Sequence, residues 1–368
     1  MRVIIINSVY GIGSTGKICS AMAHKLKSEG HDVKVVYGRG AKKDDIPFIS
    51  MQDKVGFFRH IIATRLFDHH GFASQKATAR LIKDLDIFNP DLIILHNIHG
   101  YYINVEMLFA WIKSRPSVDV EWTLHDCWAF TGHCSHFLIS QCNEWKTGCE
   151  RCINKKSYPK CLGISDSKRN YERKKASFCG VPNMKLITPS KWLADLTRES
   201  FLCEYPVTVV HNKIDNSVFH KVPSQFKRNN NIENRYMILG VSNVWSKRKG
   251  FDDFISLSKA LPESCVIVLV GVSEQQKKKL PANCIGITRT NNQVELAEIY
   301  SSADCFFNPT YEDNYPTVNL EAAACGAFII SYDTGGCKET FNSDQGIIVP
   351  VGEWHRVCEY LERIPLNE

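Results

Sequence analysis

Acidic side chains cluster around a helix-like segment late in the chain, within PTYEDNYPTVNLEAAACGAFIISYDTGGCKE, residues 309–339. Glu312 and Asp313 come just before this segment, and Glu321 lies inside it. If residues 317–325 are helical, the loop before them meets a helix N-terminus, where free amides and the helix dipole favour a diphosphate. Carboxylates in that place can accept hydrogen bonds from sugar hydroxyls or a ribose diol. The segment is therefore the first candidate for a binding site.

The same segment resembles the donor-sugar motif of retaining GT-B glycosyltransferases, specifically glycosyltransferase family 4. That family has an acidic residue, seven others, Glu, a small-residue helix, Cys-Gly, a strand and Gly-Gly-x-x-Glu. Asp313 has this spacing to Glu321, whereas Glu312 is the residue type usual at the first position, so both acids stay candidates. The resemblance implies that Glu321 binds the ribose and that Asp313 or Glu312 meets the donor sugar. It also implies donor contacts from Asn314, Tyr315, Pro316, Thr317 and Gly335. The alternative interpretation is a surface helix followed by an ordinary turn.

A basic segment, GVSNVWSKRKGFDDF, residues 240–254, follows another predicted strand. In the family, a Lys-Gly pair precedes a helix here and the Lys holds the donor diphosphate. Lys249 takes that place. A second basic residue normally lies six positions earlier, where this chain has Asn243, and Arg248 or Lys247 can substitute for it. The resemblance thus implies donor contacts from Asn243, Arg248 and Lys249, and the alternative is a solvated basic loop.

A glycine-rich stretch, YGIGSTGKICS, follows the first predicted strand. From Gly11 to Lys17 it has the letters of a P-loop, but Ile18 stands where a P-loop needs Ser or Thr for Mg²⁺. The stretch therefore lacks the Mg²⁺ ligand that a nucleotide triphosphatase needs at this position. The stretch also resembles the opening of family members that assemble polysaccharides, which implies that amides at Gly13 and Gly16 face the donor phosphates or the acceptor.

Histidines follow two further predicted strands. His125 and Asp126 come after VEW, and HNIHGYYIN begins with His96 after DLIIL. The family has a functional histidine near the first of these places. The resemblance implies that His125 lies near the reacting carbon, hydrogen-bonds the sugar and orients the acceptor hydroxyl. Asp126 would orient His125 or act on the acceptor. A core histidine bonded to backbone is the alternative.

Five of the 15 cysteines lie within residues 134–161. Cys149-x-x-Cys152 has the spacing of a zinc knuckle, and Cys134 and Cys142 could complete a tetrahedral Zn²⁺ site. We predict structural zinc here, because a long loop with little apolar content needs some other means of holding its shape. We assign no metal or other cofactor to catalysis. The alternative is a loop of free or partly oxidised thiols.

Charge is distributed unevenly along the chain. Residues 1–213 carry a net charge of +10 and residues 214–368 carry −4, which together give +6. The sequence has no nucleic-acid-binding motif, so an anionic membrane face or a phosphorylated acceptor suits the basic half better. Residues 57–66 and 155–175 place aromatic and basic side chains at helical spacing, which indicates peripheral membrane contact or a solvated basic face. No apolar run approaches the ~20 residues of a membrane span, and no signal-peptide pattern is present, so we expect a cytoplasmic location, at the inner face of the cell membrane.

The elements that position these residues are short apolar runs alternating with amphipathic stretches. This pattern is typical of parallel sheets covered by helices on both faces. We expect an α/β chain of GT-B type, with two doubly wound, Rossmann-like domains facing across a cleft, and with the motifs after the strands. The expected boundaries are an acceptor-side domain (1–213, with a Cys-rich loop at 127–161), a linker (214–235), a nucleotide-sugar-binding domain (236–350) and a C-terminal helix (351–368) that can pack back on the first domain.

The resemblance implies a retaining hexosyltransferase-type enzyme in cell-surface polysaccharide biosynthesis. Its donor would be a UDP- or GDP-sugar, and its acceptor would be lipid-linked or a saccharide. One alternative is a nucleotide-sugar epimerase of the same fold, and another is a zinc-stabilised binding protein without catalysis. Nucleic acid is not an expected partner.

Overall fold

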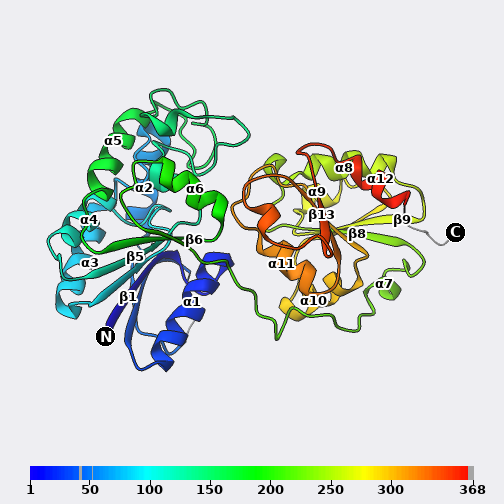
Figure 1. Ribbon diagram of the computed structural model, residues 1–368, viewed down its shortest axis with the longest axis horizontal. Helices are drawn as coiled ribbons and strands as arrows, with labels where there is room; N and C mark the ends of the chain where they lie inside the picture. The colour runs from blue at the N-terminus through cyan, green and yellow to red at the C-terminus, as the bar shows by residue number, and fades with distance from the viewer. Residues whose placement is uncertain (41–43, 52, 364–368) are drawn as a thin grey trace. The chain divides into compact units, whose positions relative to one another are not determined.

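A computed structural model describes residues 1–40, 44–51 and 53–363 of the chain. The chain divides into two compact units, Met1–Val210 and His211–Glu368, and each unit is described by itself. Both are layered α/β structures in which helices cover the two faces of a central sheet (Figure 1). We call them unit 1 and unit 2.

Within the described residues, unit 1 has a seven-stranded sheet in the order β3-β2-β1-β4-β5-β6-β7, and each neighbouring pair is parallel. Its elements are β1 (Arg2–Val9), α1 (Gly13–Ser28), β2 (Asp32–Arg39), β3 (Phe48–Ser50), α2 (Lys54–Phe67), α3 (Gln75–Phe88), β4 (Leu92–Leu95), α4 (Val105–Lys113), β5 (Asp119–Thr123), α5 (Ser167–Phe178), β6 (Met184–Thr188), α6 (Lys191–Glu199) and β7 (Val207–Val209), with short 3₁₀ turns η1 (Trp128–Phe130) and η2 (Glu144–Lys146).

Unit 2 has a six-stranded parallel sheet among its described residues, in the order β10-β9-β8-β11-β12-β13. Its elements are α7 (Phe226–Asn229), β8 (Tyr236–Val241), η3 (Lys247–Lys249), α8 (Phe251–Ala260), β9 (Cys265–Val270), α9 (Glu274–Lys277), β10 (Cys284–Ile287), α10 (Gln293–Ser302), β11 (Cys305–Asn308), α11 (Thr317–Ala324), β12 (Phe328–Tyr332), η4 (Cys337–Glu339), β13 (Gly346–Val349) and α12 (Arg356–Leu361). Two Rossmann-like parallel sheets are therefore present, which confirms the predicted fold class.

Side chains alternate in direction along each strand, which explains why each sheet is covered on both faces. In β1, Val3 and Ile5 pack in the core that contains α1, whereas Ile4 and Ile6 pack in the larger core that contains α3 and α4. Successive side chains of a strand point to opposite faces, so a strand that is apolar throughout requires helices on both sides. All six residues of β9 are buried for the same reason.

Each sheet has one point where the chain order reverses. In unit 1 this point lies between β1 and β4, and in unit 2 it lies between β8 and β11. The loops that follow these strands diverge there, and ligands of open α/β sheets bind at such positions. The segments that follow β8 and β11 are the Lys249 and Asp313 motifs, so the topology places both motifs at one edge of the sheet.

Two segments at the predicted boundaries pack within unit 2. Residues 214–235, predicted as a linker, bury Phe219 and Ile232 in a core of unit 2. The final described helix, α12, packs within unit 2: Val357 and Leu361 lie in its second core, and the Tyr360 ring stacks on Phe328. Both segments carry apolar side chains that unit 2 buries. Residues 364–368 of the predicted C-terminal helix lie outside the described residues.

Substitution of Gly250 should destabilise unit 2. It adopts φ +70°, and a β-carbon there would lie 2.2 Å from the Pro309 carbonyl oxygen. Gly250→Ala combines left-handed strain with a backbone clash, so we expect a loss of at least about 2 kcal/mol in the free energy of unfolding. Gly352→Ala is the matched control, because φ is +85° there but its nearest contact would be at 3.8 Å. Urea denaturation followed by tryptophan fluorescence measures both, and equal losses would contradict the prediction.

Candidate functional site

The loops after β8 and β11 are tied together by main-chain and side-chain hydrogen bonds. Arg248 Nη1 donates to the Glu312 carbonyl oxygen at 2.7 Å, and the Tyr311 amide donates to the Arg248 carbonyl at 2.8 Å. Gly250 lets the first loop approach Pro309 closely, as described above. The structure thus brings the two sequence motifs into direct contact.

Lys249 and Asp313 form an ion pair at the centre of this contact. Lys249 Nζ lies 2.5 Å from Asp313 Oδ2, and the two side chains are 22% and 20% exposed. Glu312 is more deeply buried, at 5% exposure, and presents its carbonyl to Arg248. Of the two acids left open by the sequence, Asp313 is therefore the one whose carboxylate reaches the predicted diphosphate-binding lysine.

Glu321 is held by a residue that the sequence analysis missed. The Tyr300 hydroxyl, on α10, donates to Glu321 Oε2, on α11, at 3.0 Å. Burial, followed by the charge and hydrogen bond of Glu321, raises the pKa of Tyr300 well above its usual value, so the hydroxyl stays protonated and remains a donor. No local pattern signals this contact, because 21 residues separate the partners.

A buried amide network anchors α11 beneath the candidate site. Asn308 Nδ2 donates to Asn319 Oδ1 at 2.8 Å, and Asn319 Nδ2 donates to Thr340 Oγ1 at 2.9 Å. The helix that carries Glu321 is therefore tied both to the end of β11 and to the segment after η4. Such a network restricts how far Glu321 can shift.

The remaining predicted donor residues lie in the same region of unit 2, with different exposure. Asn314, Tyr315 and Pro316 are buried, Thr317 begins α11, and Gly335 adopts φ +54°. The Tyr315 hydroxyl donates to the Glu339 carbonyl at 3.3 Å, which connects the start of α11 to the Gly-Gly turn segment. Asn243 is exposed in the loop after β8.

In unit 1, His125 pairs with His96. His96 Nδ1 lies 2.9 Å from His125 Nε2, and the two rings are stacked. The Asp126 carboxylate meets other partners: Oδ2 lies 3.1 Å from His99 Nε2, and Oδ1 accepts the Trp128 amide at 2.9 Å. His96 is therefore a hydrogen-bond partner of His125, whereas the Asp126 carboxylate contacts His99 and the Trp128 amide.

Burial keeps this histidine pair neutral. It lowers the pKa of His125 to about 4, with Asp126 opposing the shift, and it lowers the pKa of His96 well below its usual value. Burial raises the pKa of Asp126, but the charge and hydrogen bond of His99 outweigh this and lower it to about 2. At neutral pH the edge of unit 1 thus presents a neutral His125 beside an ionised Asp126.

The cavity lined by these groups is too small for a sugar. It measures about 10 Å³ and is bordered by His96, His99, His125 and Asp126, among others. That volume is close to the smallest that can hold one water molecule.

The N-terminal glycine loop is short, and part of the glycine-rich stretch is helical. Three residues separate β1 from α1, so Gly16 and Lys17 lie inside the helix. Gly16 is buried, and a β-carbon there would lie 3.2 Å from both Gly11 N and Val9 Cγ2, so close packing of α1 on β1 explains this glycine. Gly13, the first residue of α1, is exposed and keeps its amide at the helix N-terminus.

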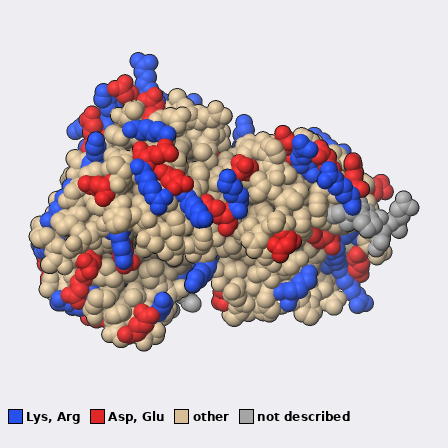
Figure 2. Space-filling view, in the orientation of Figure 1, with Lys and Arg blue, Asp and Glu red and all other residues tan. Residues whose placement is uncertain are grey.

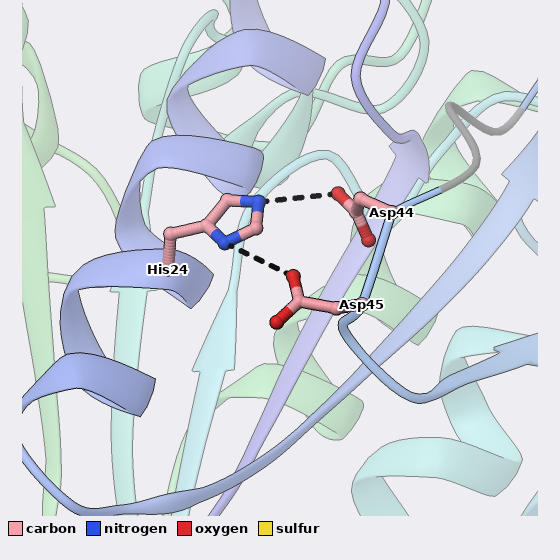
Figure 3. A group of neighbouring side chains, drawn as sticks. All are labelled: His24, Asp44 and Asp45. Atoms are coloured by element: carbon pink, nitrogen blue, oxygen red, sulfur yellow. Dashed lines mark hydrogen bonds and ion pairs between the residues drawn. The ribbon is translucent and has the colours of Figure 1, made fainter.

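Among the described residues, one group of side chains has the spacing of metal ligands. His24, Asp44 and Asp45 have ligand atoms within 4.8 Å of one another (Figure 3). Figure 3 shows the His24 ring reaching from α1 between the two carboxylates. Lys27 Nζ lies 2.5 Å from Asp45 Oδ2, and Tyr10 donates to Asp44 at 2.9 Å, so existing partners explain this surface group.

The four predicted zinc ligands do not form a closed tetrahedron. No three of the sulfurs of Cys134, Cys142, Cys149 and Cys152 come within 4.8 Å of one another in the described chain. They do lie in one loop region, between β5 and α5.

One side of unit 1 has a large apolar pocket. Its volume is about 520 Å³, within the range of small-molecule sites. Its wall includes Arg39, Met51, Phe57, Phe58, Tyr101 and Tyr102. The Arg39 guanidinium lies 5.3 Å from the Phe57 ring centroid, which places a positive charge beside an aromatic wall.

An apolar stripe continues outward from this pocket along α2. Val55, Phe58, Ile62 and Leu66 are 61%, 62%, 55% and 47% exposed, at helical spacing. Leu162 and Ile164, 59% and 75% exposed, lie beside them, because their amides donate to the Arg65 and Leu66 carbonyls at 2.7 and 3.0 Å. We call these six residues the α2 stripe. Lys54, Arg59 and Arg65 on the same helix supply positive charge.

The opposite net charges of the two halves do not produce a single-sign field on the face seen in Figure 2. Lys and Arg side chains are interspersed there with Asp and Glu side chains over both units. Among the described helices, none combines the length and apolarity that crossing a bilayer demands.

Comparisons with known proteins fit these observations. Residues 222–368 match the family model of Glycosyl transferases group 1. The chain is 29% identical over 136 residues to a putative colanic acid biosynthesis glycosyl transferase of Escherichia coli, covering 33% of this chain and 32% of that protein. It is 31% identical over 145 residues to an alpha-galactosylglucosyldiacylglycerol synthase of Streptococcus pneumoniae, covering 34% of this chain and 38% of that protein. It is 26% identical over 127 residues to an N,N'-diacetylbacillosaminyl-diphospho-undecaprenol alpha-1,3-N-acetylgalactosaminyltransferase of Campylobacter jejuni, covering 32% of each. The matches thus span about a third of the length of these relatives.

Solved structures match over nearly the whole chain at lower identity. Sucrose-phosphate synthase of Thermosynechococcus elongatus aligns with a TM-score of 0.70 at 14% identity, covering 100% of this chain and 90% of that one. Anabaena HepE in complex with UDP aligns with a TM-score of 0.66 at 13% identity, covering 98% and 89%. The two Rossmann-like units therefore have the GT-B fold, and the part of the chain from residue 222 onward resembles group 1 glycosyltransferases.

Lowering the pH from 7.5 to 5 should destabilise unit 1. Burial lowers the pKa of both His60 and His125 from 6.5 to about 4. Between these pH values the unfolded chain binds protons that the folded unit does not. The stabilisation is therefore complete above pH 6.5 and is lost as the pH falls toward 4, by up to about 3 kcal/mol for each histidine.

Thermal unfolding at a series of pH values measures this effect. His125→Gln should flatten the pH dependence, whereas His220→Gln, which changes an exposed histidine of unit 2, should leave it unchanged. A melting temperature of unit 1 that is constant down to pH 5 would refute the buried-histidine explanation.

Proposed function

We propose that this chain is a retaining glycosyltransferase that moves a sugar from a nucleotide diphosphate sugar to a lipid-linked or saccharide acceptor in cell-surface polysaccharide biosynthesis. The single observation that carries the proposal is the cluster at the β8/β11 edge. Lys249 paired with Asp313 lies there, in the region that matches the group 1 glycosyltransferase model. Anabaena HepE, a structural neighbour, was solved with UDP.

Different side chains of the cluster can bind different parts of a nucleotide sugar. Lys249 and Arg248 supply positive charge for the diphosphate, with the N-terminus of α11 nearby. Glu321, fixed by Tyr300, accepts hydrogen bonds from the ribose hydroxyls. Asp313 is then released from Lys249 to accept from the donor sugar, because the diphosphate replaces it as the partner of the ammonium.

Retention requires attack on the face from which the diphosphate leaves. The bond between the anomeric carbon and the phosphate oxygen breaks, the bond to the acceptor oxygen forms, and the acceptor proton passes to the departing phosphate. A neutral His125, oriented by His96, can hydrogen-bond the sugar without placing a second positive charge beside the developing oxocarbenium ion. Lys249 and Arg248 offset the charge of the leaving group, so we assign no catalytic role to a metal.

Substitutions in the cluster test the donor site. We expect Glu321→Gln to lower kcat/KM for transfer by about 30- to 150-fold, the equivalent of one lost charge-assisted hydrogen-bond partner. Tyr300→Phe should raise KM about tenfold with a smaller change in kcat, because only the positioning of Glu321 is lost. The matched control is Lys278→Ala, which removes an exposed lysine of the same unit.

The measurement combines thermal shifts with UDP, GDP and their sugars and product analysis with and without acceptor. Products from donor alone would instead indicate an epimerase. A Glu321→Gln variant with unchanged binding and turnover would contradict the proposed donor site.

The α2 stripe and its pocket favour a lipid-linked acceptor over a free saccharide. Exposed apolar side chains beside Lys54, Arg59 and Arg65 suit the anionic inner face of a cell membrane. The adjoining pocket has aromatic walls for an apolar chain, and Arg39 can meet a phosphate. Two of the relatives are named for diacylglycerol or diphospho-undecaprenol compounds, which supports the same acceptor class.

Vesicle binding tests this surface. We expect the full chain to sediment with phosphatidylglycerol vesicles and less with neutral phosphatidylcholine vesicles. Replacing Phe58 and Ile62 together by Ser should reduce binding about tenfold or more, because two large apolar side chains no longer enter the interface. Ile87→Ser is the control, since this residue is 83% exposed on α3, outside the stripe. Equal binding by both variants would exclude the stripe as the contact.

A further inference from the structure

Asp253 is a buried carboxylate to which the proposed donor site gives no role. It lies in the first turn of α8 and is 9% exposed. The Tyr332 hydroxyl donates to its Oδ2 at 2.8 Å, and the Tyr311 hydroxyl donates to its Oδ1 at 3.2 Å. Each oxygen of the carboxylate therefore holds one tyrosine.

The charge of Asp253 is held without an ion pair. Among the described residues, no nitrogen of a Lys, Arg or His side chain lies within 4.0 Å of this carboxylate. Burial raises the pKa of Asp253; the hydrogen bonds from Tyr332 and Tyr311 oppose this shift, and the neighbouring acid Asp252 adds to it. A buried carboxylate without a cation costs free energy, and the positive end of the α8 dipole offsets only part of that cost. The position of this carboxylate is therefore better explained by what it holds than by a gain in stability.

Tyr311 connects Asp253 to the loop that carries Asp313. It lies two residues before Asp313, and its amide donates to the Arg248 carbonyl at 2.8 Å. Its own carbonyl accepts from Thr334 Oγ1 at 2.9 Å. The amide, the carbonyl and the hydroxyl of one residue are thus bonded to three different segments. Holding the hydroxyl at Asp253 therefore helps to fix the chain just before the ion pair of the donor site.

Tyr332 connects the same carboxylate to the Gly-Gly turn. It is the last residue of β12, is fully buried, and comes three residues before Gly335. The Gly336 amide donates to the Asp313 carbonyl at 3.3 Å, so this turn also contacts the Asp313 loop directly. The rings of Tyr311 and Tyr332 meet edge to face, with centroids 5.7 Å apart. The two tyrosines therefore join the loops after β11 and β12 at one carboxylate.

We propose that Asp253 is a positioning residue of the donor site, which fixes three loops relative to one another. Its amide donates to the Gly250 carbonyl at 3.1 Å, which ties it to the loop after β8, and its carboxylate holds the loops after β11 and β12 through Tyr311 and Tyr332. An amide in its place has one acceptor oxygen and one NH₂ group, so one hydroxyl would then face a donor. Both oxygens of the carboxylate are therefore needed.

This inference rests on the proposed function and deepens it. The diphosphate of a nucleotide sugar is proposed to meet Arg248 and Lys249, and its sugar to meet Asp313. These groups come from different loops, so they can bind one ligand together only while the loops keep their spacing. Asp253 would act on the donor through that spacing, without touching the donor itself.

Asp253→Asn separates positioning from stability. We expect the dissociation constant of UDP or GDP, whichever binds the unchanged chain, to rise about tenfold in titration calorimetry. In transfer assays the donor KM should rise by a similar factor, with a smaller change in kcat. The melting temperature should stay the same or rise, because the variant buries no charge. Asp252→Asn, at an exposed position on the same helix turn, is the matched control and should leave all of these values unchanged.

Tyr311→Phe tests the connection through the Asp313 loop, and it decides the question if Asp253→Asn fails to fold. It should raise the same dissociation constant severalfold, because the loop loses one of its anchors. Tyr360→Phe is its control, since it removes a tyrosine hydroxyl from α12, which packs in the same core of unit 2. A lower melting temperature with unchanged nucleotide affinity in the Asp253 and Tyr311 variants would show a purely structural role and overturn the proposal.

Hydrogen exchange of the ligand-free chain distinguishes a failure of this inference from a failure of the proposed function. Peptides covering residues 309–316 and 332–337 should exchange faster in Asp253→Asn than in Asp252→Asn, and equal exchange would overturn the positioning role. If the unchanged chain binds neither UDP nor GDP, the proposed function fails and the exchange rates alone decide this inference. If the unchanged chain binds and Glu321→Gln weakens binding while Asp253→Asn does not, only this inference is wrong.

Discussion

The ion pair between Lys249 and Asp313 depends on a neighbour relation that exists only in the folded sheet. The two residues are 64 positions apart, and they meet because β8 and β11 lie side by side where the strand order reverses. At such a point the loops after two adjacent strands turn away from each other and leave their ends accessible. The two loops are then held together by hydrogen bonds of Arg248 and Tyr311 and by the close approach at Gly250. Everything proposed for the donor site follows from this contact, since it brings a cation and a carboxylate to one edge.

In unit 2, buried residues outside the Lys249–Asp313 pair position Glu321. Tyr300 fixes Glu321 from a neighbouring helix, and Asn308, Asn319 and Thr340 hold that helix in place. These contacts are buried, so water does not compete with them and their geometry is well defined. Unit 1 uses the same means in another form, because burial keeps His96 and His125 neutral and pairs them through a single hydrogen bond. In both units, a buried side chain holds a proposed ligand contact in place: Tyr300 holds Glu321, and His96 holds His125.

The packing of unit 1 does not explain the exposure of the α2 stripe. The stripe leaves large apolar side chains in solvent on one helix face, which is costly unless another phase covers them. The stripe therefore supports the proposed contact with an apolar, anionic surface.

Local sequence determined the strands, most helices and the composition of the candidate site. Apolar runs such as those of β1 and β9 require sheets covered on both faces, and Asp313-x7-Glu321 records a loop and a helix that are consecutive in the chain. Only the tertiary structure decided which distant groups meet: Asp313 rather than Glu312 with Lys249, His96 rather than Asp126 with His125, and Tyr300 with Glu321. It also decided that residues 214–235 and α12 belong to the cores of unit 2. The physical reason is that periodicity and spacing describe neighbours along the chain, whereas hydrogen-bond partners, burial and the resulting pKa shifts depend on which elements pack together.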